Sequence, residues 1–210
     1  QNFRAYRQIL DSATNSPPVA TLSQVSTSED TPRPFELTGG DADDDPLTFS
    51  VVSPPAIGTL VGTAPALTYS PPLNFTGTTT FRYTASDGVD TSLEKTVRIT
   101  VSPVNDAPAA QADISSGPED QPQNVNVLAN DSDVDGPTLQ LVAVAGAGPT
   151  PSFTANGNVT VTPAPNFTGT LTYTSTVSDG TATATSPLTV TVLPVNDPPS
   201  AAPVAVTVVA

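Results

Sequence analysis

The feature that most constrains this chain is a proline-rich motif that recurs at a fixed interval. Pro103-Val104-Asn105-Asp106-Ala107-Pro108 returns as Pro194-Val195-Asn196-Asp197-Pro198-Pro199, and a shorter form, Asn15-Ser16-Pro17-Pro18, lies near the start. Asn105 follows Asn15 by 90 residues, and Asn196 follows Asn105 by 91. A constant period of this length indicates repeats. Each full motif ends in proline, which lacks a backbone donor and ends a strand. We interpret it as the joint between two copies of one domain.

The period predicts the organisation of the chain. We expect an N-terminal extension (1–14), a first repeat (15–104), a second repeat (105–195) and a last segment (196–210). The last segment follows a joint just as Val19 does in the first repeat. We expect it to hold the first strand of an incomplete third repeat, or a strand donated to another subunit.

Alternating apolar residues predict short strands in both repeats. Leu47, Phe49 and Val51 show the period of two that is typical of a strand, and 19–25 is expected to form the first strand. About seven such strands per repeat predict an all-β fold with two tandem Ig-like β-sandwich domains, joined end to end as a rod. The residues expected to face the core are Phe81, Tyr83, Val97, Ile99 and Val101 in the first repeat, and Tyr173, Val177, Leu188, Val190 and Val192 in the second.

The charge is strongly acidic and unevenly distributed. The net charge is −14, and no basic residue follows Arg98. Phosphate contacts need Lys and Arg, so nucleic-acid binding is excluded, and no apolar run is long enough for a membrane span. The chain has no His, the commonest general base of enzymes, and no Cys, so it has no thiol nucleophile. The acidic residues of the second repeat are Asp106, Asp113, Glu119, Asp120, Asp131, Asp133, Asp135 and Asp179.

Four acidic features recur in each repeat. In the first they are Glu29-Asp30, the loop 41–45 with four aspartates, Asp87-Gly88, and the Asn105-Asp106 of the joint. We expect the first and third of these to face the joint, and loop 131–135 of the second repeat to face it from the other side. Two interpretations remain open. Asp and Asn favour turns because they bond their own backbone, and oxygen clusters without bases suit Ca²⁺.

The same motifs resemble a known family. The two joints, together with E-D-x-P, D-x-D-x-D, N-F-T-G and S-D-G, are similar to the cadherin-like (VCBS-type) repeats of large bacterial surface proteins, over residues 15–199. The resemblance implies an extracellular Ig-like module of a stalk or adhesin, on the cell surface or secreted. It also implies calcium at the joint. By that resemblance the candidate ligands are Glu29, Asp87, Asn105, Asp106, Asp131 and Asp133.

Three classes of function are compared. The first is a structural repeat unit of an extracellular filament or adhesin stalk, stiffened by calcium and polymerised head to tail with copies of itself through the C-terminal strand. The second is a binding module whose loops hold a carbohydrate or a protein partner on a cell surface. The third is an enzyme with paired carboxylates. One active site does not need its acids twice, so their repetition favours a protein that is not an enzyme.

Overall fold

The computed structural model describes residues 15–136 and 138–199. The chain divides between Val104 and Asn105 into two compact units. The predicted extension 1–14 and the predicted strand within 201–210 lie outside the described residues. Within the described part there is no helix that could cross a membrane.

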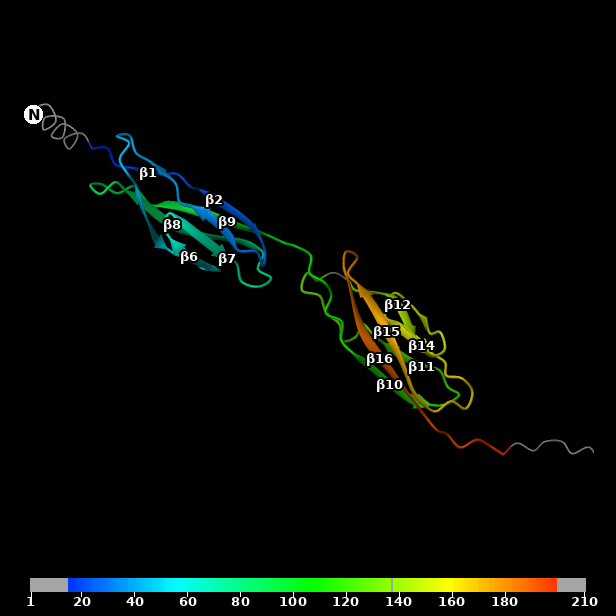
Figure 1. The fold of residues 1–210 in the computed structure, drawn as a ribbon. Coiled ribbons are helices and arrows are strands. Elements are labelled where there is room, and N and C mark those ends of the chain that lie inside the picture. The colour runs from blue at the N-terminus through cyan, green and yellow to red at the C-terminus, as the bar shows by residue number, and fades with distance from the viewer. Residues whose placement is uncertain (1–14, 137, 200–210) are drawn as a thin grey trace, which may run out of the picture. The chain divides into compact units, whose positions relative to one another are not determined.

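The first unit contains two main sheets (Figure 1). A four-stranded sheet has the order β2-β9-β8-β5 and a three-stranded sheet the order β3-β7-β6, while β1 pairs with β4. The strand β2 runs parallel to β9, and the other pairs are antiparallel. The strands are β1 (Val19–Ala20), β2 (Gln24–Ser28), β3 (Arg33–Glu36), β4 (Gly39–Gly40), β5 (Thr48–Ser53), β6 (Thr59–Thr63), β7 (Ala66–Ser70), β8 (Gly77–Ser86) and β9 (Lys95–Ser102).

The second unit repeats this topology. Its sheets have the orders β10-β16-β15-β12 and β11-β14-β13, and β10 is again parallel to β16. The strands are β10 (Asp113–Pro118), β11 (Gln123–Asn126), β12 (Gln140–Gly146), β13 (Ser152–Phe153), β14 (Asn158–Val161), β15 (Gly169–Ser178) and β16 (Thr183–Leu193). The predicted all-β class with two tandem Ig-like sandwich units is confirmed.

Each unit has its own hydrophobic core between its sheets, and all ten residues predicted to face a core are buried. Phe81, Tyr83 and Ile99 are completely buried in the first unit, and Leu188 and Val190 in the second. Alternate residues of a strand point to opposite faces, so this result also confirms the predicted register of the long strands.

The predicted first strand over 19–25 is wrong, because the segment forms two strands that pair with different partners. Residues Val19–Ala20 pair with β4, whereas β2 begins at Gln24 and pairs with β9. Between them the Leu22 N–H donates to the Tyr83 hydroxyl (2.7 Å), which itself donates to the Thr38 carbonyl (2.6 Å). The buried tyrosine thus satisfies the backbone at the point where the chain passes from one pairing to the other.

Candidate functional site

At the entry of the first unit, two acidic loops hold the incoming chain. The Asn15 amide donates to the carboxylates of Asp87 (3.1 Å) and Asp90 (2.9 Å). The Ser16 N–H donates to Asp43 (2.7 Å). These bonds join the joint motif to the β8–β9 turn and to the aspartate loop of the same unit. We call this end the entry pole.

The entry pole of the second unit repeats the same contacts. The Asn105 amide donates to Asp179 (2.9 Å), which lies in the β15–β16 turn, and the Asp106 N–H donates to Asp135 (2.8 Å). Sequence reasoning did not select Asp135 and Asp179 as candidate site residues. The repeat could have identified them, because each lies 92 residues after an acid of the first unit, Asp135 after Asp43 and Asp179 after Asp87.

The two turn aspartates are held in the charged form. Backbone N–H groups, first that of Asp90 and then that of Val89, lower the pKa of Asp87. The Ala182 N–H, followed by the Asn105 amide, lowers the pKa of Asp179. Because the pKa of each carboxyl is lower in the folded protein than its ordinary value of 3.8, the charged form stabilises the fold, and this stabilisation is fully present when the pH is above 3.8. This contribution is lost as the pH falls through the lowered pKa.

A second acidic pair closes the opposite end of each unit, which we call the exit pole. Glu29 is only 4% exposed, and its Oε1 accepts the Val104 N–H at 2.7 Å. Asp30 accepts the Asn74 N–H (2.8 Å), and carboxylate oxygens of Glu29 and Asp30 lie within 4.8 Å of each other. The counterparts in the second unit are the bonds from Val195 to Glu119 (2.7 Å) and from Asn166 to Asp120 (2.9 Å).

The six predicted ligands therefore do not form one group. Asp87 follows β8 and lies where β9 begins, whereas the Glu29 N–H bonds to Ser102 at the end of β9. Eight residues of extended strand place these ends about 26 Å apart. The expectation that Asp87 faces the same joint as Glu29 is thus corrected, because an antiparallel turn returns the chain to the entry pole. The structure does bring Asn105, Asp106, Asp131 and Asp133 to one end of the second unit, where Asp106 bonds to Asp135 of the loop that holds Asp131 and Asp133.

Several carboxylate oxygens at the entry poles are left without partners. Asp131 accepts the Gln111 N–H and Asp133 accepts the Asp135 N–H, both at 2.8 Å and both through Oδ1. Their Oδ2 atoms are buried and have no hydrogen-bond partner. The same is true of Oδ2 of Asp41 in the first unit and of Asp113 in the second. Buried anionic oxygens without donors are costly, and a cation would satisfy them.

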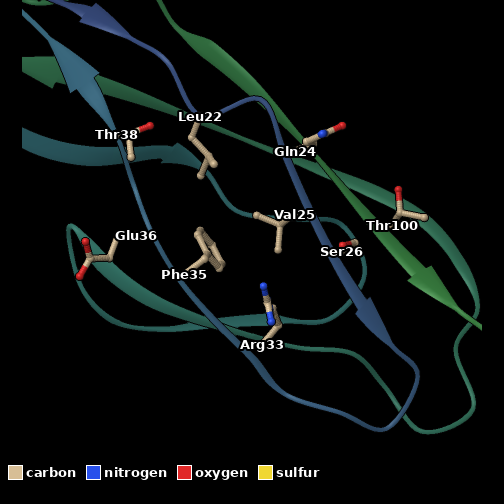
Figure 2. A pocket seen from close by; sticks show the side chains of 9 residues that line it. All are labelled: Leu22, Gln24, Val25, Ser26, Arg33, Phe35, Glu36, Thr38 and Thr100. Carbon is tan, nitrogen blue, oxygen red and sulfur yellow. The ribbon is translucent and has the colours of Figure 1, made fainter.

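The first unit also has a hollow of about 560 Å³ between the edge strands β2 and β3. Figure 2 shows Leu22, Val25 and Phe35 around its centre, with Arg33 at one end. Carbohydrate platforms present exposed aromatic rings, but Phe35 is half-buried. Among the described aromatic residues only Phe153, in the second unit, is exposed. The hollow is therefore a gap between the edges of two sheets and lacks the exposed aromatic ring of a carbohydrate platform.

The sequence profile of a family described as bacterial Ig domain matches residues 15–100 and again 105–192. The chain belongs to this family. These bacterial Ig repeats account for both sandwich units and for the duplicated acidic features. No curated protein matches the chain.

Solved structures show the same fold. Human protocadherin-24 EC1-2 is 19% identical with a TM-score of 0.59, over 86% of this chain and all of that one. Human mucin-like protocadherin EC1-2 is 16% identical with a TM-score of 0.50, over 85% and 98%. An endo-fucoidan hydrolase of glycoside hydrolase family 107 matches with a TM-score of only 0.37 and 20% identity, over 86% of this chain. The chain spans 29% of the length of that hydrolase. The cadherin repeats thus share the fold of these bacterial Ig repeats.

Proposed function

We propose that the chain is a load-bearing segment of an extracellular surface filament or adhesin stalk. The observation that carries this proposal is the parallel pairing of the entering and leaving strands in each unit. In the first unit β2 pairs with β9 from Gln24 opposite Arg98 to Ser28 opposite Ser102. In the second, β10 pairs with β16 from Asp113 opposite Leu188 to Pro118 opposite Leu193.

This pairing resists tension along the chain. A pull on the two ends of a unit moves β2 and β9 in opposite directions along their axes. The bonds between parallel strands run across that direction, so they are loaded together and not one after another. The bonds from Asn15 at the entry pole and to Glu29 at the exit pole anchor the chain just outside the paired strands.

Force spectroscopy on the full chain tests the proposal. With handles at the two termini, we expect the first unit to unfold at a clearly higher force than with handles at Ser16→Cys and Leu93→Cys. Ser16 precedes β1 and β2, and Leu93 precedes β9, so both attachment points load the parallel pair from the same end. The second geometry therefore peels β2 from β9 bond by bond. Leu93 is 92% exposed, which makes it a suitable attachment point. Equal forces in the two geometries would contradict a load-bearing role.

We also propose that Ca²⁺ stiffens the repeats at their poles. At the exit pole the ligands would include Glu29, and at the entry poles Asp87 in the first unit and Asn105, Asp106, Asp131 and Asp133 in the second. The close oxygens of Glu29 and Asp30, and the unpartnered oxygens of Asp131 and Asp133, support this. Extracellular calcium sites bind at about 0.1–1 mM. A tenfold excess of Ca²⁺ over that constant would add about 1.4 kcal/mol per site to the free energy of unfolding.

We further propose that the chain has no catalytic role and that its partners are further repeats or other copies of itself. Its acids recur in both units, where backbone amides of the same unit engage them. Residues 204–208 alternate valine with small residues, Val209 follows, and the segment carries no charge, which favours pairing with an exposed sheet edge. Deletion of 200–210 is expected to abolish filaments seen by electron microscopy. Filaments that persist in the deleted chain would contradict this route of assembly.

A further inference from the structure

Asp113, the first residue of β10, is a buried acid whose position has no structural explanation in the repeat. It is 6% exposed, and its Oδ2 has no hydrogen-bond partner. In the register of the sheet it lies opposite Leu188, a completely buried core residue. The charge of Asp131 acts on this carboxylate, which also forms a hydrogen bond with the Asn130 side chain. A carboxylate placed beside a second carboxylate at the edge of a core is costly unless a cation compensates it.

A local insertion brings Asp131 to this position. Two contacts mark the ends of the same path in each unit. In the first unit the path begins at Leu37, whose N–H donates to the Pro65 carbonyl, and ends at Gly40, which pairs with Val19. In the second unit the equivalent bonds are those of Val127 with Gly157 and of Ser132 with Ala109. The second path is two residues longer, which places an additional turn before the aspartate loop. Equivalent contacts in this loop therefore lie 92 residues apart, and not 90 as the sequence motif indicates.

The additional turn is held against the start of β10. The Asp131 N–H bonds to the Leu128 carbonyl (3.4 Å), and the Asn130 amide donates to the Ala112 carbonyl (3.1 Å). The Gln111 N–H donates to Asp131 Oδ1 at 2.8 Å. The last two of these bonds reach Gln111 and Ala112, the two residues just before Asp113, and hold the turn against the start of β10. The second oxygen of Asp131 remains buried and without a donor, like that of Asp113.

The first unit provides an internal comparison, because it lacks both acids. In the first unit Gln24 lies opposite Arg98, so the residue before it, Ser23, lies opposite Val97. In the second unit Asp113 lies opposite Leu188. Ser23 is therefore the counterpart of Asp113. By the corrected spacing, Gly39 stands where the second unit has Asp131. The fold of the repeat therefore does not require carboxylates at these two places. Their joint appearance in one repeat indicates a ligand that only this repeat holds.

We infer that Asp113 and Asp131 bind a calcium ion inside the second unit, with Oδ2 of each as a ligand. The inference deepens the calcium part of the proposed function and assigns Asp131 to a site that does not depend on the joint. One carboxylate from the start of β10 and one from an irregular turn, supplemented by water and by nearby backbone or Asn130 oxygens, suit the flexible coordination of Ca²⁺. Mg²⁺ demands near-octahedral geometry and retains its waters. The chain has no His or Cys to favour a softer metal.

Calcium titration of the full chain by isothermal calorimetry, with unit-resolved hydrogen exchange, tests this site. The variants are Asp113→Ser, which carries the residue of the first unit, Asp113→Asn and Asp131→Asn. Each is expected to lose one bound Ca²⁺ per chain or to bind it at least tenfold more weakly. Hydrogen exchange should show that Ca²⁺ no longer protects the second unit. Glu29→Gln is the matched control, because it alters the exit pole of the first unit and leaves this site intact.

Chelator separates an ion site from a merely structural acid. Without Ca²⁺, Asp113→Asn should melt at the same temperature as the parent chain or higher, since it removes an uncompensated charge. With Ca²⁺ the order should reverse. Unchanged stoichiometry and affinity in Asp113→Ser, equal destabilisation with and without Ca²⁺, or equal protection by Mg²⁺ would overturn the inference. Loss of an ion in Glu29→Gln but in none of the Asp113 and Asp131 variants would support the proposed site at the exit pole and overturn this one. Loss of an ion in the Asp113 and Asp131 variants but not in Glu29→Gln would support this site and contradict the one at the exit pole.

Discussion

Replacing Ile99 with alanine is expected to lower the free energy of unfolding of the first unit by about 2–5 kcal/mol. Ile99 is completely buried in β9, opposite Val25 on one side and Thr79 on the other. Truncation removes buried methyl groups and leaves a cavity between the two sheets, which can close only in part. Urea denaturation followed by circular dichroism measures the loss, and hydrogen exchange assigns it to residues of the first unit.

Leu93→Ala is the control for this experiment, because Leu93 is also a large aliphatic residue but is 92% exposed. Its replacement should change the free energy of unfolding by no more than about 0.5 kcal/mol. The second unit has its own core and should keep its stability in both variants. A change below about 0.5 kcal/mol for Ile99→Ala, the level of a surface substitution, would contradict the register of β9.

Replacing Glu29 with alanine is expected to destabilise the first unit by about 1.5–3 kcal/mol, the range for hydrogen bonds to charged groups. The buried carboxylate accepts the Val104 N–H, which lies beyond the last residue of β9. Without it that donor loses its partner, and the exit pole no longer holds the chain that leaves the unit. In addition to denaturation, the exchange rate of the Val104 amide measures the effect, and it should rise.

These measurements are made in chelator, so that loss of a bound ion does not contribute. Glu36→Ala is the matched control, since Glu36 is an exposed glutamate of the same unit. Glu29→Gln retains an oxygen acceptor without the charge and should fall between the parent chain and Glu29→Ala. If the Val104 amide exchanges equally fast in the parent chain and in Glu29→Ala, the anchoring role of Glu29 is wrong.

The repeat architecture could be predicted from the sequence because its signals are local. The alternation that buries Tyr83, Ile99 and Val190 depends only on the period of a strand. The acidic turns could be located for the same reason, since Asp and Asn bond their own backbone. Asp87 illustrates this: its carboxylate accepts the N–H groups of Val89 and Asp90.

Which turns meet could not be predicted in this way. Glu29 and Asp87 have the same chemistry, yet they close opposite ends of β9 because the pole of a turn depends on every strand reversal before it. The sequence aligns loop 131–135 with loop 41–45 at a spacing of 90 residues, which places the two-residue gain of the second repeat after the loop. The strand pairing places this insertion before the loop.

The sequence by itself determined that this chain forms two sandwich repeats, which faces of their strands are buried, and that acidic turns lie beside each joint. Periodicity and turn preference act over a few neighbouring residues, so they can be recognised without the fold. Only the tertiary structure decided which acids share a pole, and that Asp113 lies buried beside Asp131. Burial of a charged group depends on residues distant in the chain, here on an inserted turn that packs over the start of β10.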